Sequence, residues 1–300
     1  MAHSNRPLTS REFKIMLQTD HFTDRKKGIK EISTVTESLI EKQGAKFEAT
    51  NDYDEVERRT WFLDTNAYEL YCDKKFLLRI RKKKGSGVYD VTLKCRHPDR
   101  YVCALYDLSV AEDAETKFKN DFETKFEEDI ITGKMTDGSV TSISKFSLSA
   151  TLEDTEILPD FKKIKDIVSI FPNLELGGIG SNEPLTIVNN FKATEISSKI
   201  GAITFADDDM DVVPELNLWY SPTDNEKPLI IEFTFRCKAK KQDKDKDKDN
   251  EMFLEKYPKK LVLGVTKFYE SLQKCNNIID LDTTKTKTDY VYQKKCKSAS

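Results

Sequence analysis

The chain has 300 residues, of which 38% are hydrophobic and 34% are charged, and its 49 basic and 52 acidic residues give a formal net charge of −3. A balance so close to neutrality excludes a protein whose overall field attracts nucleic acid or an anionic membrane surface, so any basic site must be local. The charged fraction exceeds the roughly 25% that is usual in soluble domains, and part of this surplus is available to line a cavity.

The histidines and cysteines limit the kinds of catalytic or metal site that the chain can form. The only histidines are His3, His21 and His97, which is little material for a histidine-based zinc site or a Ser/His/Asp triad. Six cysteines lie far apart with no CxxC pair and no secretory signal before them, and no apolar run approaches the roughly 20 residues of a membrane-spanning helix. We therefore expect a cytoplasmic protein with reduced thiols, among which Cys95 and Cys103 are free and buried, and in which carboxylates, lysines and arginines carry any chemistry.

The first half of the chain predicts one strand, one helix and then a run of strands. Residues 12–17 predict a short strand, and apolar residues at helical spacing predict an amphipathic helix over 24–43, with Gly44 as its C-terminal stop. Runs rich in β-branched and aromatic residues predict strands over 59–65, 76–82 and 88–96. The turn at Gly85-Ser86-Gly87 joins the last two as a hairpin, since glycine tolerates the positive φ that such turns need.

Residues 117–127 allow two interpretations. Phenylalanines at 118, 122 and 126 have the four-residue spacing of a helix, whereas charges at alternate positions suit a strand with one charged face. We favour the strand. The segments 129–159 and 238–250 receive no functional interpretation from their sequence.

The second half predicts further strands between two helices. The helices are expected over 159–171 and 252–275, and the strands over 186–197, 201–206, 216–220 and 229–238. The lysine and aspartate run at 240–250 has nothing to bury and predicts a disordered loop, and we expect a flexible tail over 280–300. Because no repeat and no Pro- or Gly-rich linker divides the chain, residues 1–300 are expected to form a single domain.

Two arginines share one face of the predicted hairpin. Residues i and i+2 of a strand lie on the same side, so Arg79 and Arg81 point the same way, and the short turn brings Lys94 of the next strand beside them. Three cations on one face repel one another unless a bound anion or nearby carboxylates neutralise their charge. A solvated outer face balanced by carboxylates is the more common explanation of any single strand of this kind.

Charged faces recur on other strands, which favours a cavity. Glu12 and Lys14 share one face, and Glu232, Thr234 and Arg236 share another. A sheet with apolar faces turned outward to helices and charged faces turned inward must close around water and ligand. Inward arginines and lysines would hold phosphates through charge-assisted hydrogen bonds, and inward carboxylates would hold a hard divalent metal. We therefore expect an α+β fold, mainly antiparallel β.

The succession of motifs resembles the CYTH superfamily of triphosphate tunnel metalloenzymes. The matching motifs are EFK, FLDT, LLRIRKKKGSG, VTLK and IIEF, in that order, and the agreement is clearest between Trp61 and Lys94. The resemblance implies a closed tunnel of eight antiparallel strands, with inward charged residues and flanking helices.

The resemblance also implies roles for individual residues. The expected phosphate ligands are Lys14, Arg79, Arg81, Lys94 and Lys192, and the expected ligands of Mg²⁺ or Mn²⁺ are Glu12, Glu232 and Asp207. Lys14 is the expected catalytic residue, as the group that polarises the attacking water.

Two positions depart from the family pattern. Ser10 stands where the first glutamate of ExExK belongs, and Thr234 stands where the second glutamate of the late E-x-E pair belongs. Metal affinity falls with fewer charged ligands. Either Glu123, Glu127 or the run 207–209 substitutes for the missing carboxylates, or the metal is bound weakly.

These features predict metal-dependent hydrolysis of a linear triphosphate, either inorganic tripolyphosphate or a small organic one such as thiamine triphosphate. One alternative is a non-catalytic module that binds polyphosphate or a nucleotide with a weakened metal site. Another is an adenylate cyclase, which needs an adenine pocket that the sequence does not identify. The expected partner is a small triphosphate or polyphosphate rather than a membrane or nucleic acid, and the oligomeric state stays open.

Overall fold

The computed structural model describes residues 6–50, 53–111, 122–154, 161–205, 211–224, 226–238, 257–281, 286–293 and 296. The strands are β1 Ser10–Met16, β2 Lys46–Ala49, β3 Val56–Asp64, β4 Phe76–Lys83, β5 Tyr89–His97, β6 Phe122–Lys134, β7 Val140–Asp154, β8 Thr186–Lys199, β9 Gly201–Thr204, β10 Asp211–Tyr220 and β11 Ile230–Lys238. The helices are the 3₁₀ turn η1 Thr19–Phe22, α1 Arg25–Glu41, α2 Glu69–Cys72, α3 Arg100–Ala104, α5 Ile164–Ile170, α6 Lys259–Leu272 and α7 Lys287–Tyr292.

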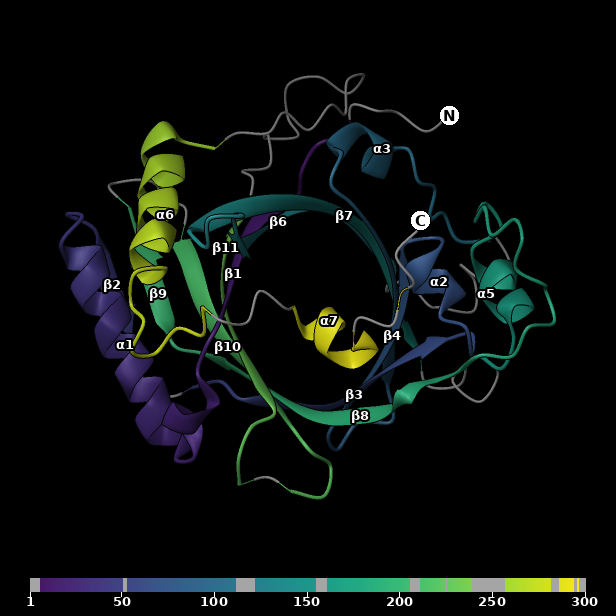
Figure 1. Cartoon of the computed structure of the whole chain (residues 1–300), viewed down its shortest axis with the longest axis horizontal. Helices are drawn as coiled ribbons and strands as arrows, with labels where there is room; N and C mark the ends of the chain where they lie inside the picture. The colour runs from purple at the N-terminus through teal and green to yellow at the C-terminus, as the bar shows by residue number, and fades with distance from the viewer. Residues whose placement is uncertain are drawn as a thin grey trace.

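The described strands form one sheet that closes on itself (Figure 1). Their order is β11-β1-β6-β7-β5-β4-β3-β8-β10-β9-β2, and an additional pairing of β10 with β11 closes nine of them into a barrel. The predicted α+β fold with a closed barrel and flanking helices is confirmed. Two details differ, because the barrel has nine strands instead of eight, and β1 pairs with β6 in parallel while the other pairs are antiparallel.

Helices α1 and α6 cover one side of the barrel (Figure 1). Alternate residues of β1 and β11 point outward, so that the rings of Phe13 and Phe235 stack with centroids 5.1 Å apart. Phe268 of α6 packs on Phe235 with a centroid distance of 4.9 Å, and Ile29 and Ile32 of α1 are fully buried in the same cluster. These apolar outer faces leave the opposite, polar faces of the same strands for the interior.

Helices α3 and α5 belong to a second apolar cluster, which covers β4, β5 and β7. Leu78 and Ile80 alternate with the arginines of β4 and are completely buried against residues such as Ile164 and Ile167. The pattern of β4 thus separates an apolar outer face from a cationic inner face, as the sequence predicted.

Several predicted elements are confirmed within a few residues. The helix predicted over 24–43 is α1, whose N-terminus is capped by the carboxylate of Asp24, and β4 and β5 form the predicted hairpin. The strand interpretation of 117–127 is confirmed from Phe122 onward, while 117–121 lie outside the described residues. Helix α5 is shorter than predicted and starts at Ile164.

The segment left without interpretation is part of the barrel wall. Residues 129–134 complete β6, and most of the following residues up to Asp154 form its antiparallel partner β7. By contrast, the charged run 240–250 lies outside the residues that the structure describes.

The C-terminal region departs from the expected flexible tail. Residues 287–292 form helix α7, in which Val291 and Tyr292 are buried. A disulfide joins Cys72 to Cys296, which corrects the expectation that the thiols are reduced, whereas Cys95 and Cys103 are free and buried as predicted. Within the described part of the chain, no helix is long and apolar enough to cross a membrane.

Candidate functional site

The barrel encloses a cavity of about 400 Å³. Among the described residues, ten basic and eight acidic side chains line it together with eleven uncharged ones, because the polar faces of the strands turn inward. This arrangement explains where the surplus of charged residues in the sequence goes.

Three arginines from neighbouring strands form one part of the wall, and we call Arg58, Arg79 and Arg81 the arginine wall. Glu195 of β8 is completely buried beside it. A guanidinium nitrogen of Arg81 lies 3.0 Å from one Glu195 oxygen, and one of Arg58 lies 3.8 Å from the other. Burial would raise the pKa of Glu195, but Arg81, Lys287 and Arg79 outweigh it and lower that pKa to about 2. Among the described residues, Glu195 is the one carboxylate within 4.0 Å of these three guanidinium groups, and Asp90 acts on Arg79 from farther away.

Arg79 is the cation of this wall that lacks an anionic partner. Among the described residues no carboxylate lies within 4.0 Å of it. One of its terminal nitrogens donates to the Thr92 hydroxyl at 3.3 Å, and its Nε has no partner. Burial and the neighbouring Arg81 lower the pKa of Arg79 to about 9, which still leaves the guanidinium charged at neutral pH.

A second group of charges, the mixed cluster, combines Glu12, Lys14, Lys94, Arg96, Glu127, Asp129 and Arg236. At its centre, Lys14 Nζ lies 2.8 Å from a Glu12 oxygen and 2.9 Å from an Asp129 oxygen. Burial alone would lower the pKa of Lys14, but Asp129 and Glu12 raise it above its ordinary value. Lys14 is thus held as an ammonium ion, which can stabilise negative charge but cannot act as a base.

The carboxylates of the mixed cluster are shared among several cations. Asp129 also accepts from Arg96 at 3.1 Å and lies 3.5 Å from Lys94 Nζ, while Glu12 accepts from Arg236 at 2.9 Å. Burial would raise the pKa of Glu12, yet Lys14 and Arg236 lower it to about 2. The same competition lowers the pKa of Asp129 far below its usual range.

The expected metal ligands are occupied by the protein's own cations. Glu12 is paired with Lys14 and Arg236, Glu232 lies 2.8 Å from Lys287 Nζ, and Asp207 lies outside the described residues. Within the described ranges, no group of three or more His, Cys, Asp or Glu residues is placed to hold a metal ion. The side chains as arranged here therefore do not fit the expected Mg²⁺ or Mn²⁺ ion.

The two positions that depart from the family pattern are both buried beside residues that line the cavity. Ser10 donates its hydroxyl to a Glu127 oxygen at 2.8 Å, so a carboxylate from a neighbouring strand stands beside the small residue. Thr234 is buried and lies opposite Lys14 in the register of β1 and β11. Of the suggested substitutes, Glu127 belongs to the mixed cluster. Glu123 also lines the cavity, but it is largely exposed and lies 2.6 Å from Lys125, and 207–209 lie outside the described residues.

Most of the predicted site residues come together in the cavity. Six of them belong to its lining: Glu12, Lys14, Arg79, Arg81, Lys94 and Glu232. The predicted placement of Lys192 is wrong, because its side chain is exposed and it lies opposite Trp61, a residue of the outer apolar cluster. Asn189 and Asn190 have positive φ, and the pairing shifts register there, which resets the faces of β8 so that Glu195 and Ser197 turn inward instead.

The charged residues in or beside the cavity that sequence reasoning missed include Arg58, Arg96, Asp129 and Glu195. Two of them carried a usable signal. Arg96 follows Lys94 at i+2, and Asp129 follows Glu127 at i+2, so each shares the face of a residue already considered. The other two depend on where β3 and β8 pair, which no local pattern reveals.

No protein-family model and no curated protein sequence matches this chain. A solved structure from Hippeastrum, proposed to be an adenylyl cyclase and described as having a dominant triphosphatase activity, is 12% identical over 94% of each chain, with a TM-score of 0.41. A protein from Pyrococcus horikoshii is 10% identical over 92% of this chain and 96% of its own, with a TM-score of 0.33.

A protein from Vibrio parahaemolyticus, proposed to be an adenylate cyclase, is 10% identical over 88% of this chain and 90% of its own, with a TM-score of 0.32. At these identities and TM-scores, the three likenesses carry no functional inference for this chain.

Proposed function

We propose that the barrel binds a linear triphosphate, or another short polyphosphate, in its cavity. The observation that carries this proposal is the arginine wall, where three guanidinium groups have one carboxylate, Glu195, within 4.0 Å and Arg79 has no ion pair among the described residues. Two unit charges 4 Å apart interact by about 4 kcal/mol at an effective dielectric constant of 20. An anion between these arginines replaces such repulsion with attraction.

The chemistry of the wall favours phosphate over other anions. A guanidinium presents planar pairs of N–H donors that match two oxygens of one phosphate group, and such charge-assisted pairs are among the strongest hydrogen bonds in proteins. Arg79 and Arg81 approach from β4 and Arg58 from β3, so successive phosphates of one chain could each meet a guanidinium. Lys14 and Lys94 belong to the mixed cluster, where a phosphate has to compete with Asp129.

A catalytic version of this proposal adds hydrolysis of the bound triphosphate with the help of Mg²⁺ or Mn²⁺. It requires the carboxylates of the mixed cluster or Glu232 to exchange their lysine and arginine partners for a metal ion. Since those partners lie at 2.8–2.9 Å from Glu12 and Glu232, binding without efficient cleavage is the function that the geometry favours. In either form Lys14 acts as a positive charge beside the phosphates and not as a proton acceptor.

The test is to titrate the purified protein with tripolyphosphate and to measure the dissociation constant by isothermal titration calorimetry. We expect Arg79→Ala to weaken binding about ten- to a hundredfold, the loss of a charge-assisted hydrogen bond. Lys192→Ala is the matched control, because it removes a cation from the outside of the same barrel, and it should leave the affinity unchanged. Equal affinities for both variants and the parent would overturn the proposal.

The same samples distinguish binding from hydrolysis. Phosphate release from tripolyphosphate, thiamine triphosphate and ATP is measured with Mg²⁺, with Mn²⁺ and without metal. Release that depends on metal and disappears in Arg79→Ala supports the hydrolase. Binding without release in any of these mixtures supports the non-catalytic module.

A further inference from the structure

Helix α7 lies within the ring of strands (Figure 1), and its buried cluster includes Met16, Leu77 and Ile230 at the ends of their strands, which places it at one end of the barrel. Its first residues, Lys287 and Thr288, line the cavity. Its last residues, Val291 and Tyr292, are buried in an apolar cluster inside the barrel. The cluster also contains Met16, Phe62, Leu77, Trp219 and Ile230. The cavity therefore meets a helix at this end instead of solvent.

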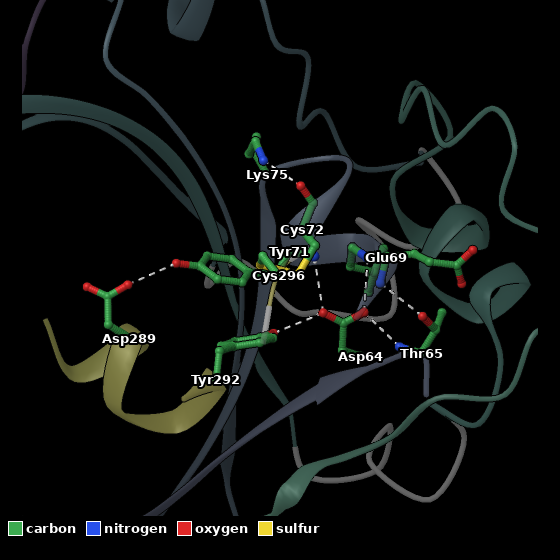
Figure 2. The surroundings of a disulfide bond; sticks show 10 residues. Asp64, Thr65, Glu69, Tyr71, Cys72, Lys75, Asp289, Tyr292 and Cys296 are labelled. Carbon is green, nitrogen blue, oxygen red and sulfur yellow. Dashed lines mark hydrogen bonds between the residues drawn. A yellow bond between two sulfur atoms is a disulfide. The ribbon is translucent and has the colours of Figure 1, made fainter. Parts of the chain in front are cut away.

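Polar contacts hold α7 in this position (Figure 2). The Tyr292 hydroxyl donates to Asp64 Oδ2 at 3.1 Å, and the Tyr71 hydroxyl donates to Asp289 Oδ1 at 3.3 Å. Asn189 donates its amide to the carbonyl of Val291 at 2.7 Å. These contacts join the helix to α2, β3 and β8, which form the rim of that end.

A covalent bond ties the same segment to the rim. Cys72 at the end of α2 is bonded to Cys296, four residues after α7 ends, although 224 positions separate the two in the sequence. A helix of six residues is too short to be stable on its own. The disulfide keeps α7 at a high effective concentration beside its docking position, and both cysteines are partly exposed, within reach of a reductant.

Lys287 makes α7 part of the cavity's charge pattern as well. Its Nζ lies 2.8 Å from Glu232 and 5.5 Å from the centre of the Trp219 ring. When α7 leaves, the cavity loses one cation, Glu232 loses its partner, and the Trp219 ring becomes accessible. Departure of the helix thus has consequences that can be measured without any ligand.

We propose that α7 is a stopper that limits the cavity to short phosphate chains, and that the Cys72–Cys296 disulfide holds it in place. This inference rests on the proposed binding of polyphosphate. With the bond intact, a chain longer than the cavity has no exit at this end. With the bond reduced, α7 can swing out and a long chain can thread through the barrel.

The reduction needs a dithiol as the electron donor. One thiolate of the dithiol attacks a sulfur of the Cys72–Cys296 bond, and its second thiol then closes a disulfide within the reductant. Two electrons and two protons pass to the protein, which is left with two free thiols.

The experiment compares the oxidised parent, the parent reduced with a dithiol, and the Cys296→Ser variant. Cys275→Ser is the matched control, since Cys275 is a partly buried cysteine without a disulfide partner. Each sample is titrated with tripolyphosphate and with long-chain polyphosphate. We expect the affinity for the long chain to rise about tenfold relative to tripolyphosphate in the reduced parent and in Cys296→Ser, and to stay at the oxidised value in Cys275→Ser.

A second readout needs no ligand. In a Trp61→Phe background, Trp219 is the only remaining tryptophan, and its quenching by acrylamide should increase on reduction or in Cys296→Ser. If the Cys296→Ser variant fails to fold, the same quenching measurement is made on the folded parent before and after chemical reduction. Thiol titration of the oxidised parent, unfolded in denaturant without reductant, should find four free cysteines, and six would overturn the tether.

The outcomes separate the two proposals. If tripolyphosphate binds but the preference for chain length is the same in every sample, the stopper is overturned and the proposed function stands. If tripolyphosphate does not bind, the proposed function fails, and unchanged Trp219 quenching would then overturn the stopper on its own.

Discussion

Arg58 and Glu195 face each other across the antiparallel pair β3 and β8, yet their closest charged atoms are 3.8 Å apart. The reason lies with two other partners, because Glu195 accepts from Arg81 at 3.0 Å and from the indole N–H of Trp219 at 2.8 Å. Glu195 is therefore held by β4 and β10, and it compensates Arg58 only weakly. The arginine wall keeps an excess of positive charge because Glu195, its one carboxylate within 4.0 Å among the described residues, pairs closely with Arg81 alone.

Glu195→Gln tests this relationship in two opposite directions. Removing the carboxylate leaves Arg81 without its buried partner, so we expect the free energy of unfolding to fall by about 3 kcal/mol. The same change makes the arginine wall more positive, so tripolyphosphate should bind several-fold more tightly to the variant than to the parent. Bound tripolyphosphate should therefore restore part of the stability that the variant loses. Urea unfolding with and without tripolyphosphate measures both effects. The exposed Glu175→Gln is the control, and a variant that loses both stability and affinity would contradict this account.

Acid pH should destabilise the protein through the cavity carboxylates. The pKa values of Glu12 and Glu195 are lowered from 4.5 to about 2 in the folded protein. A lowered pKa means that their contribution is present above about pH 4.5 and is lost as the pH falls toward 2. Each group accounts for at most about 3 kcal/mol. Unfolding free energies at a series of pH values should show a shallower decline in Glu12→Gln than in the parent, and parallel curves would refute this assignment.

The inner residues of β1, β4 and β5 were predictable because side-chain alternation is a local rule. Arg79 and Arg81 share a face whatever the strand pairs with, and the glycine turn fixes Lys94 nearby. The same rule failed for Lys192, because a bulge at Asn189 and Asn190 shifts the alternation, and no glycine or proline announces it. Local patterns thus predict faces only as far as the next irregularity.

Contacts between residues far apart in the chain could not be predicted from the sequence. Asp129 reaches Lys14 because β6 lies parallel to β1 and aligns Asp129 with Glu12, across more than a hundred intervening residues. The Cys72–Cys296 bond is a similar case, since six cysteines allow many pairings and sequence does not select among them. The ninth strand of the barrel and the position of α7 follow from the same kind of contact.

The small sheet extension formed by β2 and β9 depends on Gly201. Its φ is +155°, and a Cβ there would come within 2.3 Å of the Glu48 carbonyl oxygen, a backbone atom that cannot move aside. We expect Gly201→Ala to lower the free energy of unfolding by about 2 kcal/mol or more. Gly177→Ala is the control, because nothing lies within 4 Å of its Cβ position, and it should change stability by at most about 0.5 kcal/mol. Thermal unfolding compares the two, and equal melting temperatures would count against this packing.

Lys14→Met tests whether the Lys14 ammonium group keeps a metal ion from Glu12 and Asp129. The ammonium group separates Glu12 from Asp129, with 2.8 and 2.9 Å to their oxygens, so its removal leaves two buried carboxylates without their shared partner. We expect the unfolding free energy to fall by about 3–5 kcal/mol. The carboxylates freed in this way are oxygen ligands of the kind that Mn²⁺ prefers, so Mn²⁺ should restore part of the stability of the variant. Lys192→Met, on the outside of the barrel, should show neither effect. A Lys14→Met variant that Mn²⁺ leaves as unstable as before would show that the cluster cannot hold a metal even without its lysine.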